Sequence, residues 1–435
     1  MSMLNNAISG LNASNVALTV AGQNVANAAV EGYSRQAIQL QTAGNKLGGV
    51  EVLSVDRLVS SFLNEDIWRT NSDLSEYESK QTYLGFMEEV LGTESVSIDF
   101  SIAELGSALS AAATSPESLA YRQQVITSAK GLVQDLAQIS TAFSGQVTKL
   151  SSEMNNVSIN ASSVTEQIAE LNASIAKATS NGQPSAELKD SREKLISELS
   201  DYIGVATIER ADGMVDISTL SGAPLVIGIK GSVISASGTN ITTTYLNQKF
   251  DLDGNVGGQL GGLIKANDEV IEPTLASLDS LVADLADEVN LALQSGFDLN
   301  SNPGVDLFDY NATSPLASIT VSDTITTEEL AFKSTSAAGP GDNSNITNVL
   351  SAIDGKGDRY ISLVGDLAIM SKQNQSSITT AQDLNENAII SRDSLSGVNL
   401  DEEAASLMYF QQMYSANAKV VSTADEIFNA LIQMF

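Results

Sequence analysis

Apolar residues recur every seven positions at both ends of this 435-residue chain. Near the start, the large members of the repeat are Leu4, Leu11, Leu18 and Val25. The residues three positions further on are small: Ala7, Ser14, Ala21 and Ala28. Large and small residues alternating in this way form a narrow seam for close helix packing. The pattern predicts an N-terminal helix that needs a partner, because one thin apolar stripe buries too little surface to hold a helix alone.

The C-terminal repeat is longer. One row contains Leu400, Leu407, Tyr414, Val421, Phe428 and Phe435, and its companion row contains Phe410, Asn417, Ala424 and Leu431. Six matches in register predict a coiled-coil-like helix. We expect the two terminal helices to pack on each other and against neighbouring subunits. The candidate assembly residues are therefore Leu4, Leu11, Leu18, Val25, Leu400, Leu407, Phe410, Tyr414, Val421, Phe428 and Leu431.

A third heptad row lies in the middle of the chain, at Leu136, Phe143, Leu150, Val157, Val164 and Leu171. It predicts a long helix that begins near Ser115, where a Ser-Pro-Glu start signal stands. The helix should end before the breaker at residues 181–184, and Gly131 and Gly145 are positions where it is able to bend or split. A second helix, ending at Gly204, would return beside it as a helical hairpin.

The period changes to two after this hairpin, so residues 205–253 are expected to form a small antiparallel sheet. A helix should follow over residues 259–295, with a kink at Pro273. Residues 296–345 are loop-rich, with one strand near Ile319 to Val321, and residues 346–392 return to a helical period. The expected domains are residues 1–45 with 393–435, and residues 46–392.

These elements predict a mainly α fold with a minor β part. We expect an elongated, multi-layer protein with paired terminal coiled-coil-like helices, a long helical-bundle middle and a small antiparallel sheet.

Composition excludes several classes of function. The chain contains no Cys and no His, which removes thiolate nucleophiles, disulfides and Cys/His metal sites. With 22 Lys and Arg against 53 Asp and Glu, its net charge is −31. Such a surface repels phosphate backbones and anionic lipids, so we expect no nucleic acid and no membrane partner. The N-terminus lacks the features of a secretory signal peptide, which predicts a cytoplasmic protein or one exported by another route.

Three short motifs have a sharper and a plainer interpretation. The glycines of residues 254–262 resemble a phosphate loop, but no Lys-Ser/Thr follows them, so a sheet-to-helix turn is expected. Residues 298–304 resemble a calcium loop but place Pro303 where Gly is needed, which favours a hydrogen-bonded turn. Adjacent Glu402 and Glu403 point about 100° apart on a helix and suit its first turn. No cofactor or metal is predicted.

Both ends of the chain carry extended motifs of unusual composition. Residues 24–36, Asn-Val-Ala-Asn-Ala-Ala-Val-Glu-Gly-Tyr-Ser-Arg-Gln, resemble the N-terminal signature of the bacterial flagellar axial family, which comprises rod, hook and hook-associated proteins. Residues 396–403 and 414–425 resemble its C-terminal signature. Residues 190–199 and 296–300, with the long helical middle, resemble the hook-associated members. The resemblance covers roughly residues 1–300 and 345–435; where longer members carry β domains, this chain has only residues 296–345.

The resemblance implies a structural subunit that joins hook to filament in cell motility, and not an enzyme. It implies export through the flagellar type III channel without a cleaved signal peptide, and an extracellular place in the flagellum. Implied partners are other copies of the chain in a ring, the flagellar hook protein, the second hook–filament junction protein, and a cytoplasmic export chaperone on the C-terminal helix. The alternatives are another axial subunit, such as a hook or rod protein, or a carboxylate-based cell-wall glycosidase with two acids facing one cleft.

Overall fold

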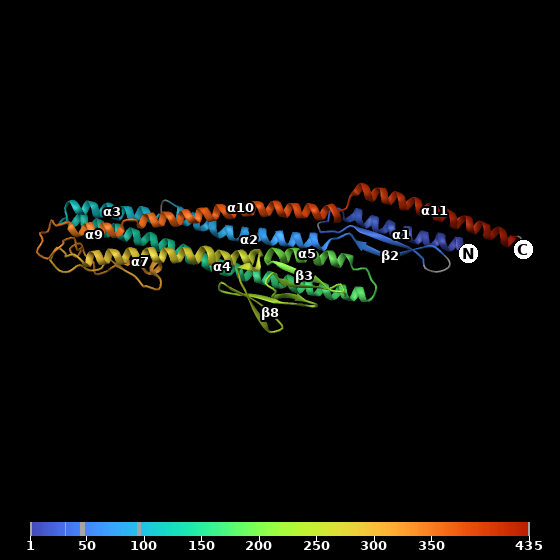
Figure 1. Cartoon of the computed structure of the whole chain (residues 1–435), viewed down its shortest axis with the longest axis horizontal. Helices are drawn as coiled ribbons and strands as arrows, with labels where there is room; N and C mark the ends of the chain where they lie inside the picture. The colour runs from blue at the N-terminus through green and yellow to red at the C-terminus, as the bar shows by residue number, and fades with distance from the viewer. Residues whose placement is uncertain (1, 31, 44–47, 94–96, 434–435) are drawn as a thin grey trace.

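The computed structural model describes residues 2–30, 32–43, 48–93 and 97–433, and its shape is elongated (Figure 1). Both ends of the chain lie at one end of the long axis, and the loops around α7 and α9 lie at the other. Long helices run along the axis, and the strands β3 and β8 lie to one side of them. The prediction of a mainly α fold with a minor β part is confirmed.

The terminal helices pack together at one end of the molecule. α1 (Ser2–Asn27) lies beside α11 (Leu400–Gln433), and a hairpin of β1 (Gln36–Thr42) and β2 (Val50–Arg57) packs against α1. The hairpin crosses the boundary expected at residue 45. We therefore propose a "terminal unit" that consists of the described residues of 2–57 and 397–433.

Long helices form the bundle, which we define as residues 61–396. These helices are α2 (Ser61–Gly92), α3 (Ile98–Thr114), α4 (Leu119–Ser180), α5 (Ala186–Tyr202), α7 (Glu272–Gln294) and α10 (Lys356–Ser396). α4 is continuous over 62 residues, or roughly 90 Å at 1.5 Å per residue. Neither Gly131 nor Gly145 breaks it. Five of the six residues of the predicted middle row are buried, and Leu171 is half-buried.

The start of α4 differs from the sequence prediction. The helix begins at Leu119 rather than near Ser115, which instead caps the end of α3. The buried Arg122 explains the difference, because its Nε donates to the carbonyl of Pro116 at 2.5 Å and holds that residue in a turn. The same guanidinium donates to the carbonyls of Thr327 and Leu330 and lies over the ring of Phe332. Burial lowers the pKa of Arg122 to about 10.

The strand region forms two antiparallel sheets rather than one. Four strands pair in chain order: β3 (Val205–Glu209), β4 (Val215–Thr219), β5 (Pro224–Ile227) and β6 (Lys230–Gly231). Three more form a meander: β7 (Val233–Ser237), β8 (Asn240–Tyr245) and β9 (Gln248–Leu252). The buried Asn172 of α4 anchors the first sheet, since its amide donates to the carbonyls of Val215 and Gly228 at 2.8 Å.

The predicted kink at Pro273 is a π-helical turn. It covers Ala266–Ile271, between α6 (Gly258–Lys265) and α7 (Glu272–Gln294). Proline lacks the amide hydrogen that a continuous α-helix needs, so the wider turn stands just before it. The tip then contains β10 (Phe308–Asp309), α8 (Pro315–Ser318), β11 (Thr320–Val321) and α9 (Ser344–Ile353). Residues 298–302 form the expected hydrogen-bonded turn, because Asp298 accepts from the backbone amide of Asn302 at 2.7 Å.

The glycines of residues 254–262 form the predicted sheet-to-helix turn, and they also permit close packing. A 3₁₀ turn at Gly254–Val256 leads into Gly257 and Gly258, which both have positive φ. A Cβ on Gly262 would collide with the carbonyl oxygen of Glu76 in α2. Only glycine lets α6 approach α2 this closely.

This contact gives a matched test. Gly262→Ala should lower the free energy of unfolding by about 1–3 kcal/mol through overpacking. Gly145→Ala in α4 should instead raise it by about 0.5–1 kcal/mol, because a Cβ there meets nothing within 4 Å and alanine is the better helix former. Chemical denaturation of both variants measures whether each substitution lowers or raises the free energy of unfolding. Equal effects would contradict the close approach of α6 to α2.

Candidate assembly interface

Small residues bring α1 and α11 together. On α1, the residues Ala7, Gly10, Ala17 and Ala21 are buried. An added Cβ on Gly10 would lie 2.7 Å from the side-chain nitrogen of Asn417 in α11. The pair is therefore tight at Gly10, which lies outside the small row of the predicted heptad, and Asn417 of the companion row of α11 faces it.

The candidate assembly residues divide into two groups. Leu4, Leu11, Leu18, Leu407, Phe410 and Val421 are half-buried along the edges of the pair. The others point outward: Val25 is exposed, and Leu400, Tyr414 and Phe428 expose 55%, 41% and 62% of their surface. The side chain of Leu431 and all of Phe435 lie outside the described residues. Leu400, Tyr414 and Phe428 of the large row of α11 thus stay exposed beside α1.

α1 carries no charge, and the middle of α11 carries little. None of the 26 residues of α1 is Asp, Glu, Lys or Arg, and between residues 404 and 424 of α11 the only charged side chain is Lys419. The two ends of α11 are acidic, with Asp401, Glu402 and Glu403 at its start and Asp425 and Glu426 near its end. The chain as a whole has a net charge of −31. This contrast was visible in the sequence and marks a candidate interface over α1 and the middle of α11.

Side chains of the N-terminal signature form hydrogen bonds at the end of α1. Asn24 is buried, and its side chain accepts from the backbone amide of Gln36 at 3.0 Å and donates to the carbonyl of Gln36 at 2.9 Å. The hydroxyl of Tyr33 donates to the same side chain at 2.9 Å. These bonds hold the chain where it returns from the end of α1 to β1.

Arg35 joins the two signatures. Its Nε donates to Glu403 at 2.7 Å and its Nη1 donates to Glu402 at 2.8 Å. Its backbone amide donates to the carbonyl of Ser396 at 2.9 Å, just before α11. Glu402 and Glu403 do occupy the first turn of a helix, as expected, but they converge on one guanidinium. Sequence reasoning missed this ion pair because its partners are 367 and 368 positions apart.

Arg57 connects the terminal unit to the bundle. Its guanidinium lies 2.6 Å from Asp190 and 2.6 Å from Glu193, both on α5. Its Nη2 also donates to Ser34 within the terminal unit. Burial raises the pKa of Asp190, and the charge of Arg57 opposes that rise. We name this group of Arg57, Asp190 and Glu193 the clamp.

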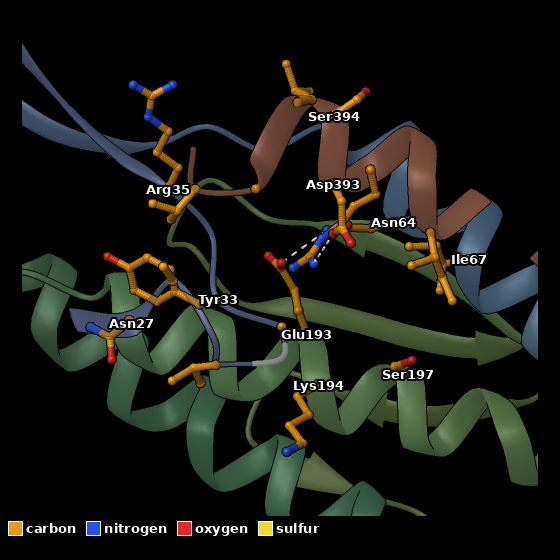
Figure 2. A pocket seen from close by; sticks show the side chains of 18 of the residues that line it. Asn27, Tyr33, Arg35, Asn64, Ile67, Glu193, Lys194, Ser197, Asp393 and Ser394 are labelled. Atoms are coloured by element: carbon orange, nitrogen blue, oxygen red, sulfur yellow. Dashed lines mark hydrogen bonds and ion pairs between the residues drawn. The ribbon is translucent and has the colours of Figure 1, made fainter. Parts of the chain in front are cut away.

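A cavity of about 1000 Å³ lies beside the clamp, between the loop after α1 and the helices α2, α5 and α10 (Figure 2). Its wall includes Tyr33 and Arg35 from the terminal unit, Asn64 from α2, and Glu193 and Asp201 from α5. Burial, followed by the negative charges of Glu198 and Glu78, raises the pKa of Asp201 to about 6.

The carboxylates of the cavity do not form a glycosidase pair. Glu193, Asp393 and Glu402 are each held in an ion pair with an arginine. Glu198 and Asp201 lie one turn apart on α5, so they share one wall and do not face each other across a substrate bond. Over the described residues, no group of three or more acidic side chains could hold a metal ion. Likewise, no helix within the described ranges is both long and apolar enough to cross a membrane.

The raised pKa of Asp201 gives a pH prediction. The folded state binds the proton more tightly than the unfolded state, so the wild-type protein loses stability as pH rises from about 4 through about 6. Asp201→Asn should be more stable at pH 8 by about 1–2 kcal/mol, a figure reduced for partial exposure. The difference should vanish below about pH 4. Urea unfolding across this pH range measures it, and a difference that grows toward low pH would contradict the assignment.

Comparisons with known proteins agree on one family. The model described as the helical domain of the flagellar hook-associated protein FlgK matches residues 84–308. A second, the C-terminal part of the flagellar basal body rod protein FlgEFG, matches residues 393–434. Flagellar hook-associated protein 1 of Escherichia coli (strain K12) is 26% identical, and the alignment covers all of both chains. The protein of the same name from Bacillus subtilis (strain 168) is 26% identical over 97% of this chain and 96% of its own.

A solved structure extends the likeness to the fold. The flagellar hook junction protein FlgK from Burkholderia pseudomallei superposes with a TM-score of 0.52 and 25% identity. The match covers 58% of this chain and 47% of that one. The alignment with the Escherichia coli relative spans 550 positions, so that relative has segments without a counterpart among these 435 residues. With the helical-domain model matching more than half of the sequence, the chain belongs to the flagellar hook-associated protein 1 family.

Proposed function

We propose that the chain is a structural subunit that joins the flagellar hook to the filament, and that copies of it assemble into a ring through the outward face of the α1–α11 pair. Membership in the hook-associated family makes it a component of the bacterial flagellum, outside the cell. The names of its relatives denote flagellar proteins and no enzymes.

The observation that carries the ring proposal is the surface of low charge formed by α1 and the middle of α11. Copies with a net charge of −31 repel each other, so stable contact needs a surface without that charge. Interface cores are depleted of charge and enriched in aromatic residues. The outward face combines the charge-free α1 with exposed Leu400, Tyr414 and Phe428. A ring joins its subunits head to tail, so the outward face of one copy is proposed to contact a different surface of the next copy.

Other proposed partners follow from the same surface. The proposed neighbours along the axis are the flagellar hook protein on one side and the second hook–filament junction protein on the other. Before assembly, the apolar side chains of α11 are open to water over Met408, Tyr409, Ile427, Phe428 and Ile432. Such a surface favours aggregation. A cytoplasmic export chaperone on α11 would cover it until the chain passes through the type III channel.

The alternative within the family of axial proteins is a hook or rod subunit, since the C-terminal helix also matches a basal body rod model. Deleting the gene separates these roles. A junction subunit predicts that hooks still form and that filament subunits leak into the medium. Loss of the hooks themselves would contradict the junction role.

A point substitution tests the interface. Tyr414→Asp places a charge on α11 at a side chain that is 41% exposed, so we expect the variant to fold and be exported but to leave filament subunits in the medium at the level of the deletion strain. Ile369→Asp on α10, at a position 67% exposed, is the control and should restore filaments. Immunoblots of the medium measure both. Normal filaments with Tyr414→Asp would refute the proposed face.

A further inference from the structure

The continuous apolar core of the protein does not extend into the region where the terminal unit meets the bundle, which we call the joint. Among the described residues, the connected core begins at Trp68 in α2 and ends at Leu367 in α10. The buried residues of α1, such as Ala17 and Val20, belong to the terminal unit alone and lie outside it. Strong packing across a joint requires such a shared core. Among the described residues, the terminal unit and the bundle thus share no connected apolar core, and motion of one against the other is expected.

Hydrogen bonds and ion pairs connect the two parts. Only two short segments connect the parts covalently: residues 58–60 after β2, and residues 397–399 before α11. Across the joint, Arg57 reaches Asp190 and Glu193, and the backbone amide of Arg35 donates to Ser396. The cavity of about 1000 Å³ occupies the space that apolar side chains would fill in a rigid joint.

The clamp is also incompletely hydrogen-bonded. Both carboxylate oxygens of Asp190 and the Nε of Arg57 are buried without a hydrogen bond of good geometry, although Asp190 lies within ion-pair distance. Buried groups that lack partners in one arrangement gain them when water enters in another. Opening the joint therefore satisfies these atoms while breaking the ion pair. This balance between hydrogen bonds gained and an ion pair lost is typical of a joint with two accessible arrangements.

We propose that this joint is a hinge, that the terminal unit tilts on the bundle about residues 58–60 and 397–399, and that the clamp of Arg57, Asp190 and Glu193 holds the angle seen here. The cavity beside the clamp becomes smaller when the terminal unit tilts toward the bundle and larger when it tilts away. Breaking the clamp widens the range of angles without unfolding either body.

The chain supplies its own probes. Trp68 is the single tryptophan, lines the cavity and is 8% exposed, so acrylamide quenching of its fluorescence reports access of solvent to the joint. Because the chain has no cysteine, spin labels attach only where cysteine is introduced. Asn5→Cys with Ser191→Cys places labels across the joint, and Thr148→Cys with Ser191→Cys places them within the bundle. All three positions are exposed.

Electron–electron double resonance then compares Arg57→Gln and Glu193→Gln with the wild-type protein. We expect a broader or shifted distance distribution for the cross-joint pair, an unchanged one for the bundle pair, and stronger quenching of Trp68. For Arg57→Lys, which keeps the charge, we expect a distance distribution and a quenching of Trp68 between those of the wild-type protein and Arg57→Gln. Arg359→Gln removes an exposed arginine ion pair on the bundle surface and should change neither readout.

Circular dichroism checks that the helices are retained. If Arg57→Gln lowers the helical signal, the distance and quenching measurements on Glu193→Gln test the hinge instead. Wild-type distributions across the joint in both variants, together with unchanged quenching, would overturn the hinge. Broadening of the bundle pair as well would show loss of folding rather than motion at a hinge, and would overturn it too.

Discussion

The close pairing of α1 with α11 is the constraint on which the rest of the structure depends. The pairing brings together two segments from opposite ends of the sequence, and it relies on the absence of a side chain at Gly10 opposite Asn417. Arg35 then secures the base of the pair through Glu402 and Glu403. Because the ends meet, the chain between them must travel out along the bundle and come back. The elongated shape follows from this closure.

The two parts of the molecule are stabilised by different physics. The bundle has a continuous apolar core along the 62-residue α4, which makes it a stiff rod. The terminal unit relies on small residues and on a uniform lack of charge along α1. The first arrangement is self-sufficient. The second leaves apolar side chains such as Tyr414 and Phe428 in water, where the proposed contact with other copies would cover them.

Much of this architecture was predictable from periodicity. The row from Leu136 to Val164 is buried as its spacing indicates, because burial of a helix face imposes the repeat directly. The hairpin of residues 36–57 was also within reach, since Ile38 with Leu40 and Val50 with Val52 alternate, but the expected boundary at residue 45 cut through it. The candidate residues of α11 were found from the predicted register, while the structure was needed to show which of them α1 leaves exposed.

What periodicity could not give are contacts between single polar residues far apart in sequence. Arg57 and Asp190, or Arg122 and the carbonyl of Leu330, leave no periodic trace, because one ion pair or one hydrogen bond imposes no pattern on its neighbours. These contacts nevertheless set where α4 begins and how the terminal unit sits on the bundle.

The claim that most needs testing is that copies of the chain meet through the uncharged face of the α1–α11 pair. Electron cryomicroscopy of isolated hook–filament junctions tests it directly. The account predicts that the side chains of Leu400, Tyr414 and Phe428 are buried against the α1 or α11 helix of an adjacent copy. A map in which adjacent copies touch only through their bundles, with this face open to solvent, would contradict it.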